Sequence, residues 1–185
     1  MFQHMDIQQE TALIARIQHG RRDDFADLVV EYKKPIYNLI FRMTGSHQEA
    51  EELAQETFVR AFQNLHRFVP GRRFFPWLYT LCLNLVRNHL KKKQPFPVAH
   101  QDMAEGVMAH GDNPEQSMVR RQEAEELYTL VRRLPMDMRE ALVLRFYQDL
   151  SFADVALILD ISISGAKMRV YRGLEQLRQL MRTED

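Results

Sequence analysis

The middle of the chain combines cations, aromatic rings and amide side chains within a short stretch of sequence. Residues 66–76 read His-Arg-Phe-Val-Pro-Gly-Arg-Arg-Phe-Phe-Pro, a loop whose arginines can bind phosphates while its phenylalanine rings stack on bases or line a pocket. Four polar residues follow at the i, i+3, i+4 and i+7 spacing that places them on one face of a helix. We name the whole set the strand face, because it suits a single nucleic-acid strand: Arg67, Phe68, Arg72, Arg73, Phe74, Phe75, Asn84, Arg87, Asn88 and Lys91. Trp77, within a Trp-Leu-Tyr triplet, is interpreted as a core residue instead of a stacking residue.

A second set of polar side chains lies near the C-terminus. Ser151 can cap a short helix over residues 152–159, a tight turn follows at residues 160–162, and another helix begins near Ser164. This order fits the helix-turn-helix pattern, whose second helix enters the major groove of DNA, although an ordinary helical hairpin has the same spacing. Its outward hydroxyls and long cations can reach phosphates and base edges. We name these residues the duplex face: Ser162, Ser164, Lys167, Arg169 and Arg172.

Acidic and basic residues are sharply separated along the N-terminal half. Residues 44–59 hold four glutamates and no Lys or Arg, whereas residues 57–101 hold eight Lys or Arg and no acid. The formal net charge of zero over 185 residues, which alone argues against a nucleic-acid binder, is therefore a cancellation. The acidic block places polar side chains on one helix face, here named the acidic ridge: Glu49, Glu52, Gln55 and Glu56. Two adjacent surfaces of opposite charge indicate two different partners.

The residues with reactive or metal-binding side chains form no catalytic pattern. The seven histidines are scattered, with no pair at metal-ligand spacing beside Cys or Glu, and no glycine-rich phosphate loop is present. The single cysteine, Cys82, lies among leucines, which favours burial over nucleophilic catalysis. We therefore expect a protein without enzymatic activity, metal or cofactor, located in a reducing cytoplasm, with no signal peptide and no membrane-inserted segment.

Helical periodicity predicts an all-α fold of two small helical domains joined by a flexible linker. The expected boundaries are residues 1–93 for the first domain, 94–117 for the linker and 118–185 for the second domain. Prolines and glycines mark the linker, and residues 94–118 hold four acids without a Lys or Arg. Such a segment can mimic nucleic acid on a basic channel wall, or it can serve as a solubilising tether.

Local signals predict where several helices begin and end. Gly45 is expected to end one helix and Ser46 to cap the next, while Pro35 lies inside the first of the two. In the second domain, Asp137 is expected to cap a helix that follows Pro135. The last helix is expected to bury Val170, Leu174, Leu177 and Met181.

Several ordered motifs resemble those of bacterial sigma factors. Residues 134–145, Leu-Pro-Met-Asp-Met-Arg-Glu-Ala-Leu-Val-Leu-Arg, resemble the opening of sigma region 4, and residues 151–156 and 167–173 continue that resemblance. Residues 50–58, Ala-Glu-Glu-Leu-Ala-Gln-Glu-Thr-Phe, resemble region 2, together with Phe-Pro-Trp-Leu-Tyr at residues 75–79 and with Asn84. With two helical units and a short linker, the chain is similar to the extracytoplasmic-function (group 4) sigma factors over residues 10–93 and 118–182.

The resemblance implies a complete set of partners for a bacterial stress-response regulator of transcription. The acidic ridge would dock on the clamp helices of the largest subunit of RNA polymerase. The strand face would capture the unpaired −10 element of a promoter, and the duplex face would read the −35 element. An anti-sigma factor, often membrane-bound in this family, would hold the protein inactive. The alternative function is a stand-alone helix-turn-helix regulator that binds duplex operators, which would need neither the acidic ridge nor the aromatic loop.

Overall fold

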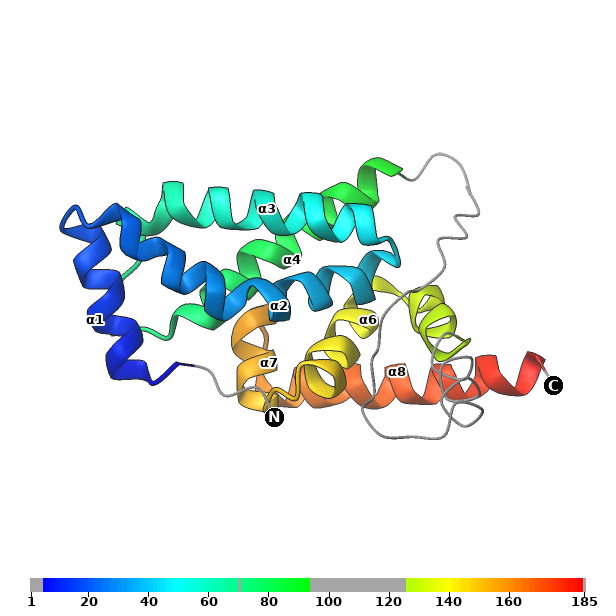
Figure 1. Cartoon of the computed structure of the whole chain (residues 1–185). Helices are drawn as coiled ribbons and strands as arrows, with labels where there is room; N and C mark the ends of the chain where they lie inside the picture. The colour runs from blue at the N-terminus through cyan, green and yellow to red at the C-terminus, as the bar shows by residue number, and fades with distance from the viewer. Residues whose placement is uncertain (1–4, 70, 94–125, 185) are drawn as a thin grey trace, which may run out of the picture.

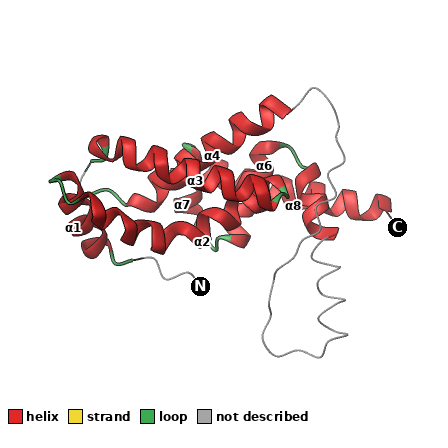
Figure 2. Cartoon of the chain, turned by 45° about the horizontal axis from the view of Figure 1, so that its top comes forward, coloured by secondary structure: helices red, strands yellow, loops and turns green. Residues whose placement is uncertain are grey.

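The computed structural model describes residues 5–69, 71–93 and 126–184, and every regular element within these ranges is helical (Figures 1 and 2). The N-terminal unit contains α1 (Ile7–Gln18), α2 (Phe25–Thr44), α3 (His47–Asn64) and α4 (Phe74–Lys93). The C-terminal unit contains a helix over residues 126–133, then α6 (Met136–Leu142), a π-helical segment (Val143–Tyr147), α7 (Phe152–Leu159) and α8 (Ile163–Glu184). The prediction of an all-α fold is confirmed, while the linker predicted over residues 94–117 lies outside the described residues.

Short-range signals fix most of the helix ends. Gly45 ends α2 in the left-handed conformation, with φ of 77°, and Ser46 begins α3 by accepting a hydrogen bond from the Glu49 N–H at 3.3 Å. Ser151 caps α7 in the same way, accepting from the Asp154 N–H at 3.1 Å. Asp160 then adopts a left-handed φ of 53°, which makes the tight turn before α8.

Two local predictions for the C-terminal unit are wrong. Helix α6 begins at Met136 with Pro135 at its N-cap, so Asp137 lies in the first turn and forms no side-chain cap. On α8, Leu174 and Met181 are exposed by 36% and 53%, although Val170 and Leu177 are buried as expected. The buried stripe of α8 runs through Ala166, Val170, Gly173 and Leu177, which leaves Leu174 at its edge. Met181 lies near the end of a helix of 22 residues, whereas α6 and α7, against which it packs, have 7 and 8.

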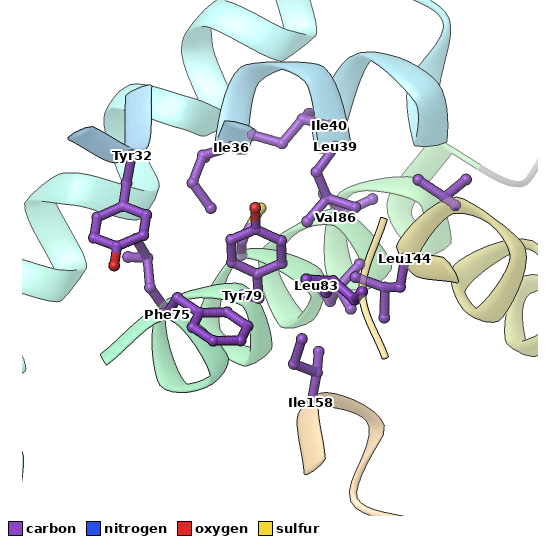
Figure 3. Close-up of a cluster of buried hydrophobic side chains, with 14 of the residues drawn as sticks. Tyr32, Ile36, Leu39, Ile40, Phe75, Tyr79, Leu83, Val86, Leu144 and Ile158 are labelled. Carbon is purple, nitrogen blue, oxygen red and sulfur yellow. The ribbon is translucent and has the colours of Figure 1, made fainter. Parts of the chain in front are cut away.

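The two units pack directly against each other and share one hydrophobic core. Helix α4 contacts α7, and α2 contacts the π-helical segment. Figure 3 shows this junction, where Leu39 of α2 and Leu83 and Val86 of α4 lie near Leu144 and Ile158 of the C-terminal unit. All five side chains are buried. The sequence did not predict this contact, because helical periodicity identifies a buried face and not the element that covers it.

Candidate nucleic-acid and protein interfaces

Helix α4 and the preceding loop are positioned by buried polar contacts from α1. Glu10, exposed by only 3%, accepts a hydrogen bond from the Phe74 N–H at 2.9 Å and another from the Tyr32 hydroxyl. Burial, reinforced by Glu10, raises the pKa of Tyr32, so the hydroxyl remains a donor at neutral pH. The Gln18 amide donates to the carbonyls of Leu65 and Phe68 at 2.8 and 2.9 Å. Sequence reasoning missed Glu10 and Gln18, because neither belongs to a recognisable motif.

Arg87, in the middle of the strand face, is held by the C-terminal unit. Its Nε and Nη2 atoms donate to the two carboxylate oxygens of Glu140 on α6, at 2.5 and 2.7 Å. The hydrogen bonds that Arg87 donates to Glu140 raise the pKa of Arg87, although its partial burial acts in the opposite direction. Glu140 is 2% exposed and the Arg87 side chain 30% exposed, so the pair is largely shielded from water. Arg87 and Glu140, which are 53 positions apart in sequence, thus form a bidentate ion pair that joins the two units.

Arg73, the strand-face residue directly before α4, also contacts the C-terminal unit. Its Nη1 donates to Asp154 of α7 at 2.6 Å, and its guanidinium lies 4.3 Å from the centroid of the Phe75 ring. Asp154 accepts at its other oxygen from Ser151, the residue that caps α7. The strand face is therefore connected to the C-terminal unit at two points, Arg87 and Arg73.

The three phenylalanines of the strand face lie inside the fold. Phe68, Phe74 and Phe75 are exposed by 5%, 0% and 2%. The first two form an aromatic cluster with Trp77, with ring centroids 5.4 to 5.6 Å apart, and Trp77 is partly buried against the core. No ring of the three is available to a base in this arrangement. Their contact with the −10 element stays a prediction, and it would require the loop to rearrange.

The other members of the strand face are accessible. Arg67, Arg72, Asn84, Asn88 and Lys91 are all exposed. The Asn84 amide oxygen accepts from Arg87 Nη1 at 2.9 Å, which joins the exposed stripe of α4 to the Glu140 pair. The helical spacing that predicted this stripe is present in α4, and Arg87 within the stripe lies at the junction between the units.

The duplex face is open to solvent. Ser162, Ser164, Lys167 and Arg172 are exposed, and Arg169 is partly exposed at 3.9 Å from Asp137. The Ser162 hydroxyl accepts from the Gly165 N–H at 3.0 Å and lies 3.1 Å from the Ser164 hydroxyl, which ties the start of α8 to the turn. Ser162 directly precedes α8, and the other four residues lie in the first three turns of that helix.

The acidic ridge divides into two parts on α3. Glu52, Gln55 and Glu56 are exposed, with Glu52 accepting from Gln48 at 2.9 Å and Glu56 paired with Arg60. The Glu49 side chain is only 13% exposed, and its carboxylate lies 3.0 Å from His89 Nε2 of α4. Glu49 therefore links the ridge helix to the strand-face helix, whereas the other three face solvent.

An apolar groove that the sequence reasoning did not find lies beside the ridge, between α2 and α3. Its volume is about 1150 Å³, and Gln55 of the ridge contributes to its lining. Val30, Val59 and Phe62 line it and are exposed by 80%, 49% and 40%, with Lys33 at the rim. The only sequence signal was the presence of large apolar residues on exposed helix positions, which is common on protein surfaces.

The described residues contain no group of three or more His, Cys, Asp or Glu side chains that could hold a metal ion. Cys82 is fully buried, and burial raises the pKa of its thiol to about 12. Within the same ranges, no helix combines the length and the apolar composition needed to cross a bilayer.

Comparison with known proteins agrees with the two-unit architecture. A family model described as Sigma-70 region 2 matches residues 28–96, and one described as Sigma-70, region 4 matches residues 124–177. The first match contains the ridge helix α3 and the whole strand face, and the second contains the duplex face. The fold and its polar faces thus define a chain with two sigma-70 regions.

Curated relatives match the chain over nearly its whole length. The ECF RNA polymerase sigma factor SigW of Bacillus subtilis is 35% identical over 177 residues, covering 91% of this chain and 95% of the relative. The RNA polymerase sigma-H factor of Pseudomonas aeruginosa is 31% identical, covering 92% of each chain. The chain belongs to the extracytoplasmic-function sigma factors of the sigma-70 family.

Solved structures show the same fold. CnrH, determined in complex with the cytosolic domain of CnrY, matches with a TM-score of 0.74 and 20% identity, covering 97% of this chain and all of CnrH. The sigma factor RpoE of Bartonella quintana, in complex with the anti-sigma factor NepR, matches with a TM-score of 0.67 and 22% identity over 88% of this chain and 99% of RpoE.

Proposed function

We propose that this protein binds the RNA polymerase core and directs promoter-specific initiation of transcription. The observation that carries the proposal is the presence of three separate polar surfaces on one chain: the strand face on α4, the duplex face on α8 and the acidic ridge on α3. A stand-alone operator binder needs only the duplex face. The three surfaces also fall within the two matched sigma-70 regions, residues 28–96 and 124–177.

The duplex face supplies the contact with double-stranded DNA at the −35 element. Lys167 and Arg172 lie on the exposed side of α8, and the serines at its start can donate to phosphates or base edges. Because the turn after α7 is fixed by Asp160, the whole set enters the major groove as one rigid helix. Register on the DNA then comes from the phosphate contacts, and sequence preference from the base contacts.

The strand face holds the unpaired −10 strand through cations and amides on α4 and its loop. Strand separation needs no nucleotide hydrolysis in this scheme, since the protein binds the open strand better than the duplex and thereby shifts the equilibrium. Arg87 and Asn84 sit at the centre of this surface, and Lys91 extends it toward the end of α4. We propose no catalytic step by the chain itself.

The acidic ridge is the proposed contact with the clamp helices of the polymerase. Exposed Glu52 and Glu56 suit an arginine-rich partner helix, because charge complementarity directs encounter and register. The ridge and the apolar groove next to it offer a partner helix both a charged edge and an apolar face. This combination is typical of helix recognition by a groove.

We further propose an inhibitory partner and a division of the chain into functional parts. Two proteins of the same fold were solved with partners, CnrH with the cytosolic domain of CnrY and RpoE with the anti-sigma factor NepR. By analogy, an anti-sigma factor would control this protein in the bacterial cytoplasm, where the polymerase works. The proposed parts are residues 1–93 for core and −10 binding, 94–117 as the linker and 118–185 for −35 binding.

The decisive experiment adds the purified chain to core polymerase on supercoiled genomic fragments and maps new transcript starts. We expect starts that appear only when both components are present, preceded by a shared pair of short sequence elements. Specific duplex binding without core, combined with no core-dependent start, would instead support the operator-binding regulator.

A further inference from the structure

Two arginines assigned to the strand face are engaged by carboxylates of the C-terminal unit. Arg87 binds Glu140 through two parallel hydrogen bonds, and Arg73 binds Asp154 through one. Arginine binds phosphate with the same planar fork that it uses here for a carboxylate. Glu140 therefore occupies the position on Arg87 that a phosphate of a bound strand would take.

Because of the surroundings of Glu140, Arg87 cannot bind Glu140 and a DNA phosphate at the same time. A carboxylate that is 2% exposed is strongly disfavoured without a charged partner, so Arg87 cannot turn to DNA while Glu140 remains buried. Leu83 and Val86 next to Arg87 on α4 are also buried, in the same junction as Leu144 and Ile158 (Figure 3). Both the ion pair and the apolar contacts must separate before this part of α4 can meet a strand.

Uncharged hydrogen bonds give the junction a defined register. The Tyr79 hydroxyl donates to the Gln148 amide oxygen at 3.0 Å, and the Gln148 amide nitrogen donates to the Pro35 carbonyl at 3.3 Å. Thr80 donates its hydroxyl to the Ile158 carbonyl at 2.9 Å. Because these groups are paired across the units, the junction has the features of a specific interface and not of a loose collapse.

We infer that, in the free protein, the inner face of the C-terminal unit is the ligand of the strand face, with Glu140 and Asp154 standing in for phosphates of the −10 strand. This inference rests on the proposed function, because that function assigns Arg73 and Arg87 to the strand. The free chain then has one DNA surface that is blocked at Arg73 and Arg87 and one that is open, since the duplex face on α8 remains exposed. Separation of the units, on the polymerase for example, releases the strand face.

The expected size of the effect follows from the population of the open form. When only the open form binds, the apparent dissociation constant equals the intrinsic constant divided by the open fraction. A variant that opens the junction therefore increases the affinity for single-stranded DNA, up to the ratio of closed to open molecules. The duplex face needs no such opening, so its affinity stays the same.

The test uses the full chain and a fluorescein-labelled, mixed-sequence 15-nucleotide single strand. Glu140→Gln removes the charge from the junction with little change in shape, and we expect it to tighten strand binding by about tenfold or more. The matched control is Glu175→Gln, which removes the same charge from an exposed pair with Arg178 within α8 and should leave binding within about twofold. A second opening variant, Thr80→Val, removes a junction hydrogen bond without changing charge and keeps the test valid if Glu140→Gln does not fold.

A distance measurement shows whether tighter binding comes from opening. Dyes are placed at Gln63→Cys on α3 and Gln179→Cys on α8, both exposed, while the buried Cys82 stays unlabelled. We expect energy transfer to report one defined distance in the wild type and a shifted, broader range of distances in Glu140→Gln and Thr80→Val. The inference is overturned if the folded opening variants keep the closed distance, or if they open without binding the strand more tightly.

Failure of the inference and failure of the proposed function give different results. Core-dependent initiation by the wild type, together with unchanged strand binding by an opened variant, rejects the inference and keeps the proposed function. Absence of core-dependent initiation rejects the proposed function. Closure between the units would then still be measured by energy transfer, but the inference that it blocks a −10 strand would fall with the function on which it rests.

Discussion

The strand face and the duplex face are built from the same kinds of residue, and the fold treats them differently. Arg87 of the strand face is 30% exposed and bound to a buried carboxylate, whereas Arg172 of the duplex face is exposed. Helix α4 lies among α2, α3 and α7, while α8 packs on α6 and α7 of its own unit (Figure 1). Position within the fold, more than residue type, decides which surface is free. Five predictions test this difference and the packing behind it.

Removing one arginine from each face distinguishes an arginine that stabilises the fold, Arg87, from one that is proposed only to bind DNA, Arg172. Arg87→Ala leaves Glu140 buried without its charged partner, so we expect a loss of about 3–5 kcal/mol in the free energy of unfolding. Arg172→Ala removes an exposed side chain, and the expected change stays within about 0.5 kcal/mol. Urea unfolding followed by circular dichroism measures both. Equal stability of the two variants would contradict the difference between the faces.

The end of α2 tests whether the junction extends beyond Arg87. The Arg139 guanidinium donates to the Met43 carbonyl at 3.1 Å, and a Cβ added at Gly45 would lie 1.5 Å from a guanidinium nitrogen of Arg132. Gly45→Ala therefore combines the strain of a left-handed alanine, about 1–2 kcal/mol, with displacement of an arginine of the C-terminal unit.

Gly71 provides the matched control for this substitution. It also has a positive φ, of 83°, but nothing lies within 4 Å of an added Cβ. Gly71→Ala should therefore show the backbone strain alone, and thermal unfolding of the two variants should place Gly45→Ala below Gly71→Ala. If both variants unfold at the same temperature, the contact between Arg132 and the end of α2 has no measurable effect on stability.

Much of the fold and part of the site could be predicted from local sequence, for a definite physical reason. Caps and turns such as Ser46, Gly45 and Asp160 are short-range devices, and helical spacing correctly grouped the exposed stripe of α4. The pairing of Arg87 with Glu140 joins residues 53 positions apart, and no local pattern contains it. Burial of Phe68 also depends on long-range packing, since a loop phenylalanine looks the same whether it faces a base or the core.

The acidic ridge also contains one residue that is exposed and one that is engaged within the fold. Glu52 is exposed, whereas Glu49 lies against His89 of α4. We expect Glu52→Lys to weaken binding to the polymerase core by roughly tenfold with no change in stability, because like charges would face each other in the proposed interface. Glu49→Gln should mainly lower stability, since it removes a contact between α3 and α4. Pull-down with purified core and thermal unfolding distinguish the two; unchanged core binding by Glu52→Lys would contradict the assignment of the ridge.

The buried side of α4 supplies a reporter that separates opening of the junction from unfolding. Cys82 is 0% exposed and its side chain interacts with Thr57 of α3, so it lies in the core of the N-terminal unit. We expect its thiol to be unreactive toward Ellman's reagent at pH 8 in the wild type and equally in Glu140→Gln. Fast reaction in Glu140→Gln would mean that the substitution unfolds the N-terminal unit instead of separating it from the C-terminal unit.

The same thiol makes stability depend on pH in a direction that can be derived. Its pKa is about 12 in the folded protein and about 8.5 in an unfolded chain, so above pH 9 the unfolded state loses the proton first. The folded state then binds more protons, and the free energy of unfolding falls as pH rises toward 12, by at most about 1.4 kcal/mol per pH unit from this group. Below pH 8 both states keep the proton and the contribution is constant. In urea unfolding at pH 7 and pH 10, Cys82→Ala should show a smaller fall in the free energy of unfolding than the wild type. An identical fall in both proteins would show that the thiol is not shielded from water by its place on α4.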